Sequence, residues 1–203
     1  MKTKLIPFLL LVIVVTSCKK TKTVTNNVTI TDTVTAVEMP VQSILKKAIL
    51  FDTDLVVNAG NYEIGAKFYS SDSGVITKLG LRSPIVNKAF AVSLWDVATE
   101  TLIVTDSITV TDSAQFAYAS ITPVHVSPNK AYIISYNNTV GGVALDYNVS
   151  QSKTTGGVQF PFADGDITFV SEDELSTSTS VYPTNEYTNS FLATVDVVFQ
   201  AIK

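Results

Sequence analysis

The residues that most often carry catalysis are scarce in this chain of 203 residues. It has one histidine, His125, and one cysteine, Cys18. A structural zinc site takes four ligands, mostly cysteine and histidine, and a serine triad needs a histidine beside its nucleophile. His125 lies in the alternating segment PVHV, with no nucleophile motif around it. We therefore expect a solvent-facing strand histidine, no metal site, no cofactor and no enzyme.

Carboxylates are the second chemical resource. A glycosidase places two of them across one cleft and raises the pKa of one. Asp96, Asp146 and Asp196 lie at or within apparent strands, and Asp196 interrupts an apolar run. We expect such positions to face solvent or to bond a neighbouring turn. The acidic segment 164–174 offers oxygen ligands for calcium without the spacing of a calcium loop, so it predicts a solvated acidic loop.

Loop aromatics are the third resource. Two tyrosines flank an asparagine in the polar segment STSTSVYPTNEYTNS, and a Tyr-Asn pair ends the segment VGGVALDYN. Rigid rings beside amides and hydroxyls are typical of recognition surfaces. Loops that are distant in sequence can meet at one end of a sandwich, although the tyrosines could instead pack onto their own domain. The predicted ligand site comprises Tyr147, Asn148, Tyr182, Asn185, Tyr187 and, as a further aromatic, Trp95.

A targeting segment precedes these residues. A basic end at 1–4 is followed by the apolar run Leu5–Val15, which is too short for the ~20 residues of a membrane span. The box Val15-Thr16-Ser17-Cys18 resembles the bacterial lipoprotein cleavage site, whose cysteine is diacylated and becomes the N-terminus. We predict a signal peptide over 1–17 and attachment to the membrane through acyl chains on Cys18.

The residue that follows Cys18 and the net charge of the chain both indicate a cell-envelope protein. The residue after the cysteine is Lys19, so the aspartate-type signal for inner-membrane retention is missing, and we expect an outer-membrane location. Removal of residues 1–17 leaves 12 basic and 18 acidic residues, a net charge of about −6. An acidic protein has no general attraction to phosphate backbones, which excludes nucleic acid as a partner.

The chain after Cys18 divides into a tether and a domain. Residues 18–42 are rich in Thr and Val without an aromatic residue, which indicates a lipid-anchored extended tether. The alternative is a real strand at Val28–Val37, where apolar and polar residues alternate. Residues 43–203 are enough for one domain with a substantial core. A helical stripe at Val41–Leu50 is a further possibility, although its end more readily enters a sheet.

The sequence of residues 43–203 predicts an all-β fold, namely an antiparallel β-sandwich of immunoglobulin-like or jelly-roll-like type. Apolar and polar residues alternate over Tyr62–Tyr69, and a Ser-Asp-Gly turn leads to the next strand. Alternation directs Phe68, Leu94 and Ile134 inward and places Trp95 on the opposite face from Leu94. The other inward residues are Val195, Val197 and Phe199. Further strands are expected at Val75–Arg82, Ala89–Val97, Leu102–Val110, Gln115–Ile121, Lys130–Asn137, Val143–Val149, Ile167–Val170 and Phe191–Gln200.

Four ordered motifs carry a resemblance to a known family. They are NYEIGAKFYSSDSGVITKLGLR (61–82), VSLWDVATETLI (92–103), TPVHVSPNKAYIISY (122–136) and ATVDVVF (193–199). In this order they resemble the bacterial domain-of-unknown-function 4082 family, a β-sandwich module of exported proteins found beside immunoglobulin-like and carbohydrate-binding modules. The chain departs from it at Leu79, Leu81 and Arg82 and at Gln115-Phe116, where the family has aromatic residues. The resemblance implies a fold and an extracellular setting, and it implies no reaction.

Two functions fit these expectations. The first is a lipid-anchored, non-catalytic module that binds a glycan or another surface polymer. The second is a structural or assembly component that meets another envelope protein through a strand edge or loops. An exposed row of aromatic rings would favour the first, and a long uncovered edge strand would favour the second.

Overall fold

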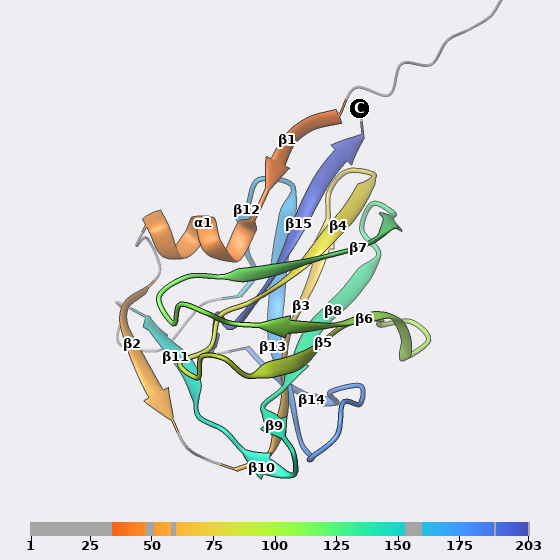
Figure 1. Cartoon of the computed structure of the whole chain (residues 1–203). Helices are drawn as coiled ribbons and strands as arrows, with labels where there is room; N and C mark the ends of the chain where they lie inside the picture. Colours follow the sequence, from red (N-terminus) through yellow and green to blue (C-terminus); the bar gives the residue numbers. More distant parts are fainter. Residues whose placement is uncertain (1–33, 48–50, 58–59, 153–159, 189, 203) are drawn as a thin grey trace, which may run out of the picture. The chain divides into compact units, whose positions relative to one another are not determined.

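The structure is a computed structural model that describes residues 34–47, 51–57, 60–152, 160–188 and 190–202 (Figure 1). These residues belong to one compact unit, Asp32–Lys203. The predicted signal peptide, Cys18 and the tether as far as residue 33 lie outside the described residues.

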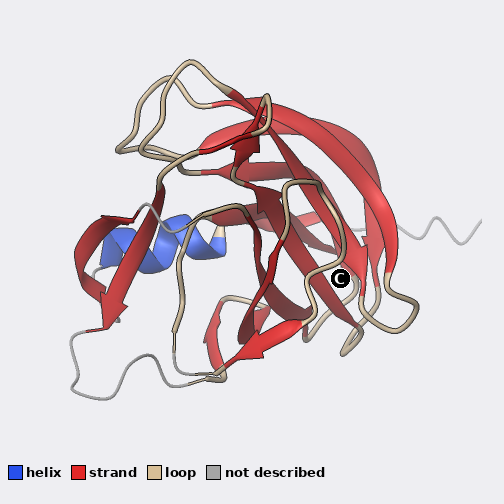
Figure 2. Cartoon of the chain, turned by 90° about the horizontal axis from the view of Figure 1, so that it is seen from below, coloured by secondary structure: helices blue, strands red, loops and turns tan. Residues whose placement is uncertain are grey.

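The described chain is an antiparallel β-sandwich with one helix, so the predicted fold class is confirmed (Figures 1 and 2). One sheet has the strand order β1-β15-β4-β7 and the other β12-β13-β3-β8-β5-β6, with β14 paired to β13. Two further ribbons are β11-β2 and β10-β9. The elements are β1 (Val34–Glu38), α1 (Pro40–Lys47), β2 (Phe51–Val57), β3 (Tyr62–Ser70), β4 (Gly74–Leu81), β5 (Ala89–Asp96), β6 (Thr101–Thr109), β7 (Ala117–Val126), β8 (Ala131–Asn137), β9 (Thr139–Val140), β10 (Val143–Ala144), β11 (Tyr147–Ser152), β12 (Phe162–Asp164), β13 (Ile167–Ser176), β14 (Asn185–Tyr187) and β15 (Val195–Ile202).

The core lies between the two large sheets, because the apolar positions of each alternating strand point inward. Ala66 of β3, Ile134 of β8 and Leu94 of β5 stand opposite one another across three strands, and all are buried. The other side of the core is formed by apolar residues of β4 and β15, which belong to the smaller sheet. All six residues predicted to point inward are buried: Phe68, Leu94, Ile134, Val195, Val197 and Phe199.

The N-terminal boundary differs from the expected one at residue 43. β1 pairs antiparallel with β15, and Val41 and Ile44 of α1 are buried in the core. The predicted helical stripe thus forms a helix, because two of its apolar residues pack against the sheet. The tether therefore cannot extend to residue 42, since residues from 34 onward are part of the folded unit.

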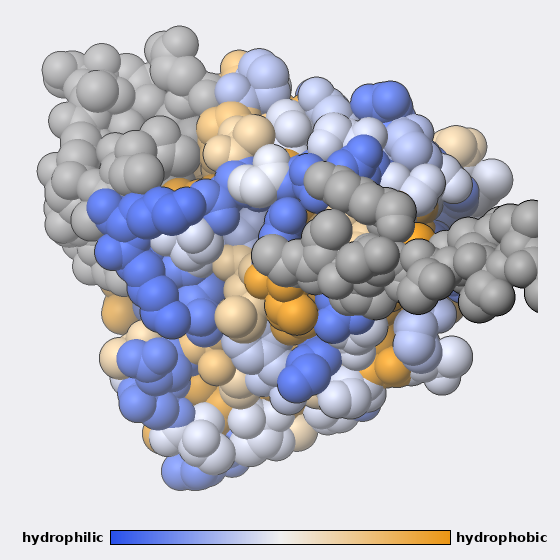
Figure 3. All heavy atoms as spheres, turned by 90° about the horizontal axis from the view of Figure 1, so that it is seen from above, coloured by the Kyte–Doolittle hydropathy of each residue, from blue (hydrophilic) through white to orange (hydrophobic). Residues whose placement is uncertain are grey.

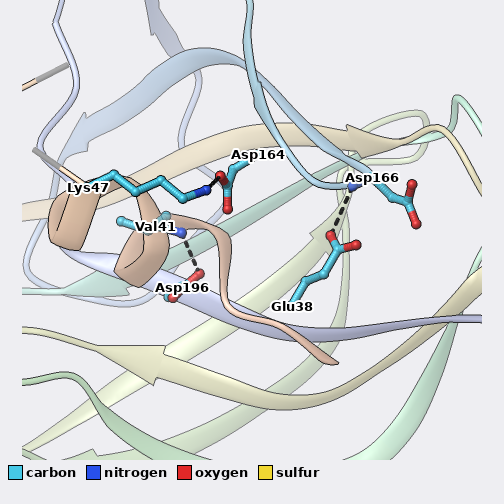
Figure 4. A network of polar contacts seen from close by, with 6 residues as sticks. All are labelled: Glu38, Val41, Lys47, Asp164, Asp166 and Asp196. Carbon is cyan, nitrogen blue, oxygen red and sulfur yellow. Dashed lines mark hydrogen bonds and ion pairs between the residues drawn. The ribbon is translucent and has the colours of Figure 1, made fainter. Parts of the chain in front are cut away.

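Polar contacts hold this N-terminal segment against the C-terminal half of the chain (Figure 4). Asp196 of β15 accepts hydrogen bonds from the backbone N–H groups of Val41 and Gln42, each at 3.0 Å. Glu38 accepts one from the backbone N–H of Asp166 at 3.0 Å, and Lys47 forms an ion pair with Asp164. These contacts join residues that are more than 100 positions apart.

The acidic segment also differs from its prediction as a solvated loop. Most of it belongs to the ten-residue strand β13, where Glu172 and Asp173 are buried. The described residues contain no group of three or more His, Cys, Asp or Glu that could hold a metal ion. A sequence rich in carboxylates predicts a solvated loop, whereas pairing with β3 places most of this segment inside a sheet.

Candidate functional site

The candidate site begins with the short strand β14, which pairs with β13 beyond β12, on the edge that faces away from β3. Asn185 stands opposite Glu174, and Tyr187 stands opposite Glu172. Directly paired residues of an antiparallel ladder project from the same face of a sheet. Glu172 and Glu174 pair on the other side with Ala66 and Ile64 of β3, which are core residues. Asn185 and Tyr187 therefore project from the core-facing side, at the sheet's edge.

Two more tyrosines adjoin this edge. The rings of Tyr62 and Tyr147 meet edge to face, with centroids 6.3 Å apart and an interplanar angle of 74°. Tyr62 begins β3 and Tyr147 begins β11, so two elements far apart in sequence bring the rings together. Tyr147 is 7% exposed and Tyr187 is 39% exposed, so one of these side chains is buried and the other is accessible to solvent.

Glu174 links these rings electrostatically. Its negative charge is the main reason why the pKa of Tyr187 is raised. The pKa of Tyr147 is raised first by burial and then by the same carboxylate. The carboxylate of Glu174 therefore acts on the hydroxyl groups of both tyrosines. We name Tyr62, Tyr147, Tyr187 and Glu174 the tyrosine–carboxylate site.

Beneath this site lie polar groups that the fold does not satisfy. Glu172 is buried, and its Oε2 accepts a hydrogen bond from the backbone N–H of Leu192 at 3.1 Å. Its Oε1, the hydroxyl of Tyr136 and the Nδ2 of Asn148 have no hydrogen-bond partner among the described residues. Burial raises the pKa of Glu172 well above its ordinary value and also raises that of Tyr136. Glu172 and Tyr136 also interact electrostatically, which contributes to the raised pKa of the tyrosine.

Trp95 and Tyr182 lie on the other face of the same sheet. Their rings meet edge to face at 6.0 Å and 84°. Trp95 is on the opposite face from Leu94, as predicted, but it is only 7% exposed because the segment before β14 covers it. Tyr182 thus packs onto its own domain, which was the alternative considered for the loop tyrosines. The structure brings together Tyr147, Asn185 and Tyr187 around Glu172 and Glu174, and it separates Trp95 and Tyr182 from them. Asn148 follows Tyr147 on β11 and is buried, and its backbone position is opposite Val56 of β2.

The described hollows lie elsewhere, beside α1. One of about 230 Å³ is lined by Gln42, Lys46 and Phe116, among others, and one of about 420 Å³ by Glu38, Lys46 and Asp164, among others. On the face seen in Figure 3, apolar side chains occur in small patches between hydrophilic ones. Among the described residues, no helix has the length and apolar character needed to cross a membrane.

Comparison with known families identifies the fold unit. The sequence model of the domain of unknown function DUF4082 matches residues 53–192. The chain belongs to this family. The match covers the strands from β2 to β14 and therefore includes every residue of the tyrosine–carboxylate site. No curated protein matches the chain.

The DUF4082 match ends before β15 and begins after α1, although both are part of the folded unit. Four residues of the site or its surroundings could not be singled out from the sequence: Tyr62, Tyr136, Glu172 and Glu174. Tyr62 lies within an alternating strand, where its hydroxyl group gives no separate signal. Glu172 and Glu174 were visible only as part of an acidic segment.

The remaining sequence candidates, of which Asp196 lies beyond the DUF4082 match, have structural positions. His125 is exposed on β7, as predicted. Asp96 forms an ion pair with Lys130 at 2.5 Å, and this contact lowers the pKa of Asp96. Asp196 is buried and binds the start of α1, so the expectation that it faces solvent or a neighbouring turn was wrong.

Proposed function

We propose that this chain is a lipid-anchored cell-envelope protein whose DUF4082 sandwich is a non-catalytic module that binds a glycan or another surface polymer. The observation that supports this function best is the tyrosine–carboxylate site. It combines three neighbouring tyrosine rings with a half-buried carboxylate on one edge of a sheet. The anchor would be Cys18, and the expected location is the outer membrane.

Saccharides suit the chemistry of this site. The faces of their rings carry C–H groups that pack on aromatic side chains, while their hydroxyls both donate and accept hydrogen bonds. Glu174 is an acceptor beside the rings, and the exposed Asn185 opposite it supplies a donor and an acceptor.

The experiment is a glycan-array screen with a soluble form that spans residues 32–203, the compact unit of the structure. A hit is then titrated with wild type, Tyr187→Ala and Tyr69→Ala. Tyr187→Ala should weaken binding by about tenfold, equivalent to about 1.4 kcal/mol. Tyr69 is the matched control because its side chain projects from the opposite face of the same sheet. Equal affinity of wild type and Tyr187→Ala would contradict the assignment of the site.

A specific observation supports the assembly alternative. β6 ends the larger sheet and pairs only with β5, so one side of this nine-residue strand has no ladder partner in the described sheet. Leu102 and Ile103 of β6 are 48% and 37% exposed. Edge strands of this kind can accept a strand from another chain. If this is the function, the double variant Leu102→Lys, Ile103→Lys would lose an envelope partner in cross-linking, while Tyr187→Ala would keep it.

A further inference from the structure

The segment Thr177–Thr184, which we name the strap, leaves the end of β13 and crosses the outer face of the larger sheet before β14 begins. Side chains of the sheet hold its backbone. Nδ2 of Asn137 donates hydrogen bonds to the carbonyl oxygens of Thr177 and Thr179 at 3.4 and 3.0 Å. The hydroxyl of Ser180 lies 3.1 Å from that of Ser93. The strap is therefore attached mainly through side chains rather than through a strand ladder.

A buried carboxyl group lies at the centre of this attachment. Nε1 of Trp95 donates to Oγ of Ser135 at 2.7 Å, and Ser135 donates to Oε1 of Glu63 at 2.5 Å. Ser180 of the strap donates to the same oxygen at 3.4 Å. Oε2 of Glu63 has no hydrogen-bond partner among the described residues, and the residue is fully buried. We name Glu63, Ser135, Trp95 and Ser180 the clasp.

The strap continues directly into the candidate ligand site. Its last residue is followed by Asn185 and Tyr187 of β14, a strand of three residues that pairs with β13 alone. On the outer face, Lys67 forms ion pairs with both Asp173 of β13 and Glu186 of β14. A three-residue ladder has little stability of its own, so the position of β14 depends on where the strap is held.

We propose that the clasp is a protonation-controlled fastening of the strap, and that Glu63 thereby acts as a positioning residue for Asn185 and Tyr187. With a neutral carboxyl group the strap stays on the sheet and β14 keeps its register. With an ionised one, the strap lifts so that water reaches the charge, and β14 loosens. The effect on ligand binding rests on the proposed function, whereas the clasp and its effect on β14 can be measured without a ligand.

The electrostatics of Glu63 place the change near neutral pH. Burial raises the pKa of Glu63 to about 7, and hydrogen bonds from Ser135 and its other polar neighbours only partly oppose this. The other titratable groups on this face are Lys67, Asp173, Glu186 and Tyr182, with Glu100 near Tyr182. Tyr136 approaches from the core side. Lys67 is already paired with Asp173 and Glu186, so it does not neutralise Glu63.

The first experiment uses Trp95, the only tryptophan of the chain, as the reporter. Its ring contacts Tyr182 of the strap, and its N–H is two hydrogen bonds from Glu63. The emission of the 32–203 form should change with pH between 5 and 9, with a midpoint near 7. Glu63→Gln should abolish the transition, and Asp196→Asn, which removes a buried carboxyl group from the other sheet, should retain it. A transition that persists in Glu63→Gln, or none in wild type, would overturn the proposal.

The second experiment locks the strap. Ser93→Cys with Ser180→Cys should form a disulfide, since the two hydroxyl oxygens are 3.1 Å apart, and the 32–203 form contains no other cysteine. Hydrogen exchange at residues 185–187, corrected for the intrinsic effect of pH, should accelerate about tenfold between pH 6 and 8 in wild type. It should not accelerate in the oxidised variant, and reduction should restore it. Equal acceleration in oxidised and reduced forms would show that the strap does not control β14.

Ligand binding then separates the two proposals. For any glycan found in the screen, affinity should fall about tenfold from pH 6 to pH 8 in wild type and stay constant in the oxidised variant. A pH-independent affinity beside intact fluorescence and exchange transitions would overturn the link from β14 to the ligand while leaving the clasp in place. Absence of any glycan ligand would count against the proposed function alone.

Discussion

The carboxylate of Asp196 caps the N-terminus of α1, because it accepts a hydrogen bond at 3.0 Å from the backbone N–H of Val41, 155 residues earlier in the sequence. Its second oxygen accepts the N–H of Gln42 and the hydroxyl of Tyr118, at 3.0 and 2.8 Å. The first N–H groups of a helix lack partners within it, and a capping residue usually comes from the same chain segment. Here the cap comes from β15, which is close to α1 in space but near the C-terminal end of the folded unit, so it also ties α1 to the sheet (Figure 4).

Asp196→Ala should therefore destabilise the domain strongly. It removes the cap and leaves the buried N–H of Val41 and the hydroxyl of Tyr118 without their acceptor, with an expected loss of about 2 to 4 kcal/mol. Urea unfolding of the 32–203 form would measure it. Asp106→Ala is the control, since that carboxylate bonds only the N–H of the adjacent Ser107 in an exposed position. A loss below about 0.5 kcal/mol for Asp196→Ala would contradict the capping role.

The pH dependence of Asp196→Asn tests the same residue in another way. Burial raises the pKa of Asp196 from 3.8 to about 6, despite its hydrogen bonds. The unfolded chain releases this proton first, so wild type loses stability as pH rises from about 4 to 6. The variant does not titrate there, and its unfolding free energy relative to wild type should rise over that window by about 2 to 3 kcal/mol. A constant difference between the two proteins from pH 4 to 7 would show an ordinary carboxyl group.

Removal of residues 32–47 should lower the melting temperature of the soluble form by about ten degrees or more. Val41 and Ile44 are 0% and 4% exposed, and burial of such side chains contributes about 1.5 to 3 kcal/mol each. In a domain of this size, about 1 kcal/mol corresponds to roughly 2 to 4 degrees. Lys46→Ala, on the exposed side of α1, should stay close to wild type in differential scanning calorimetry. A shift of only a few degrees on truncation would restore the boundary near residue 43.

The two tyrosines of the predicted loop should behave differently when truncated. Tyr182→Ala removes a ring that packs on Trp95 and should lower stability by about 1 to 2 kcal/mol. Tyr187→Ala removes a ring that is 39% exposed and should leave the melting temperature nearly unchanged. Equal losses in both variants would mean that Tyr187 is a packing residue and not a contact for a ligand.

Cys18 is tested in cells. If residues 15–18 are a lipoprotein cleavage box, Cys18→Ala should leave the protein unprocessed or release it into soluble fractions. Ser17→Ala keeps a small residue before the cysteine and should be processed normally. Metabolic labelling with a fatty-acid analogue and fractionation would measure both effects. Labelled, membrane-bound Cys18→Ala protein would refute the anchor.

Most of the fold can be predicted from the alternation of apolar and polar residues along the strands. The side chains of β3 and β5 point inward or outward as their sequence period requires, and even the side of the sheet on which Trp95 lies followed from its neighbour Leu94. Alternation does not show which other segment of the chain packs over an outward-facing side chain. Trp95 was therefore placed correctly, while its cover, Tyr182, is 87 residues away in sequence.

The errors came from residues whose roles depend on distant partners. Asp196 interrupts an apolar run, and nothing near it in sequence indicates that α1 needs an acceptor there. Tyr182 and Tyr187 are five positions apart, yet they lie on opposite faces because the strap crosses the outer face before β14 returns to the edge of β13. Their proximity in sequence suggests one shared site, whereas the path of the chain places the two side chains on opposite faces of the sheet.

The place of β15 within its sheet has a consequence for how the protein is made. β15 is the last strand in sequence order, yet it lies between β1, the first, and β4. During synthesis, β1 and α1 emerge long before the strand that supplies their ladder and Asp196. The ladders on both sides of β15 therefore cannot form until this strand has been synthesised, so the smaller sheet is completed only after all other strands of the described domain have emerged.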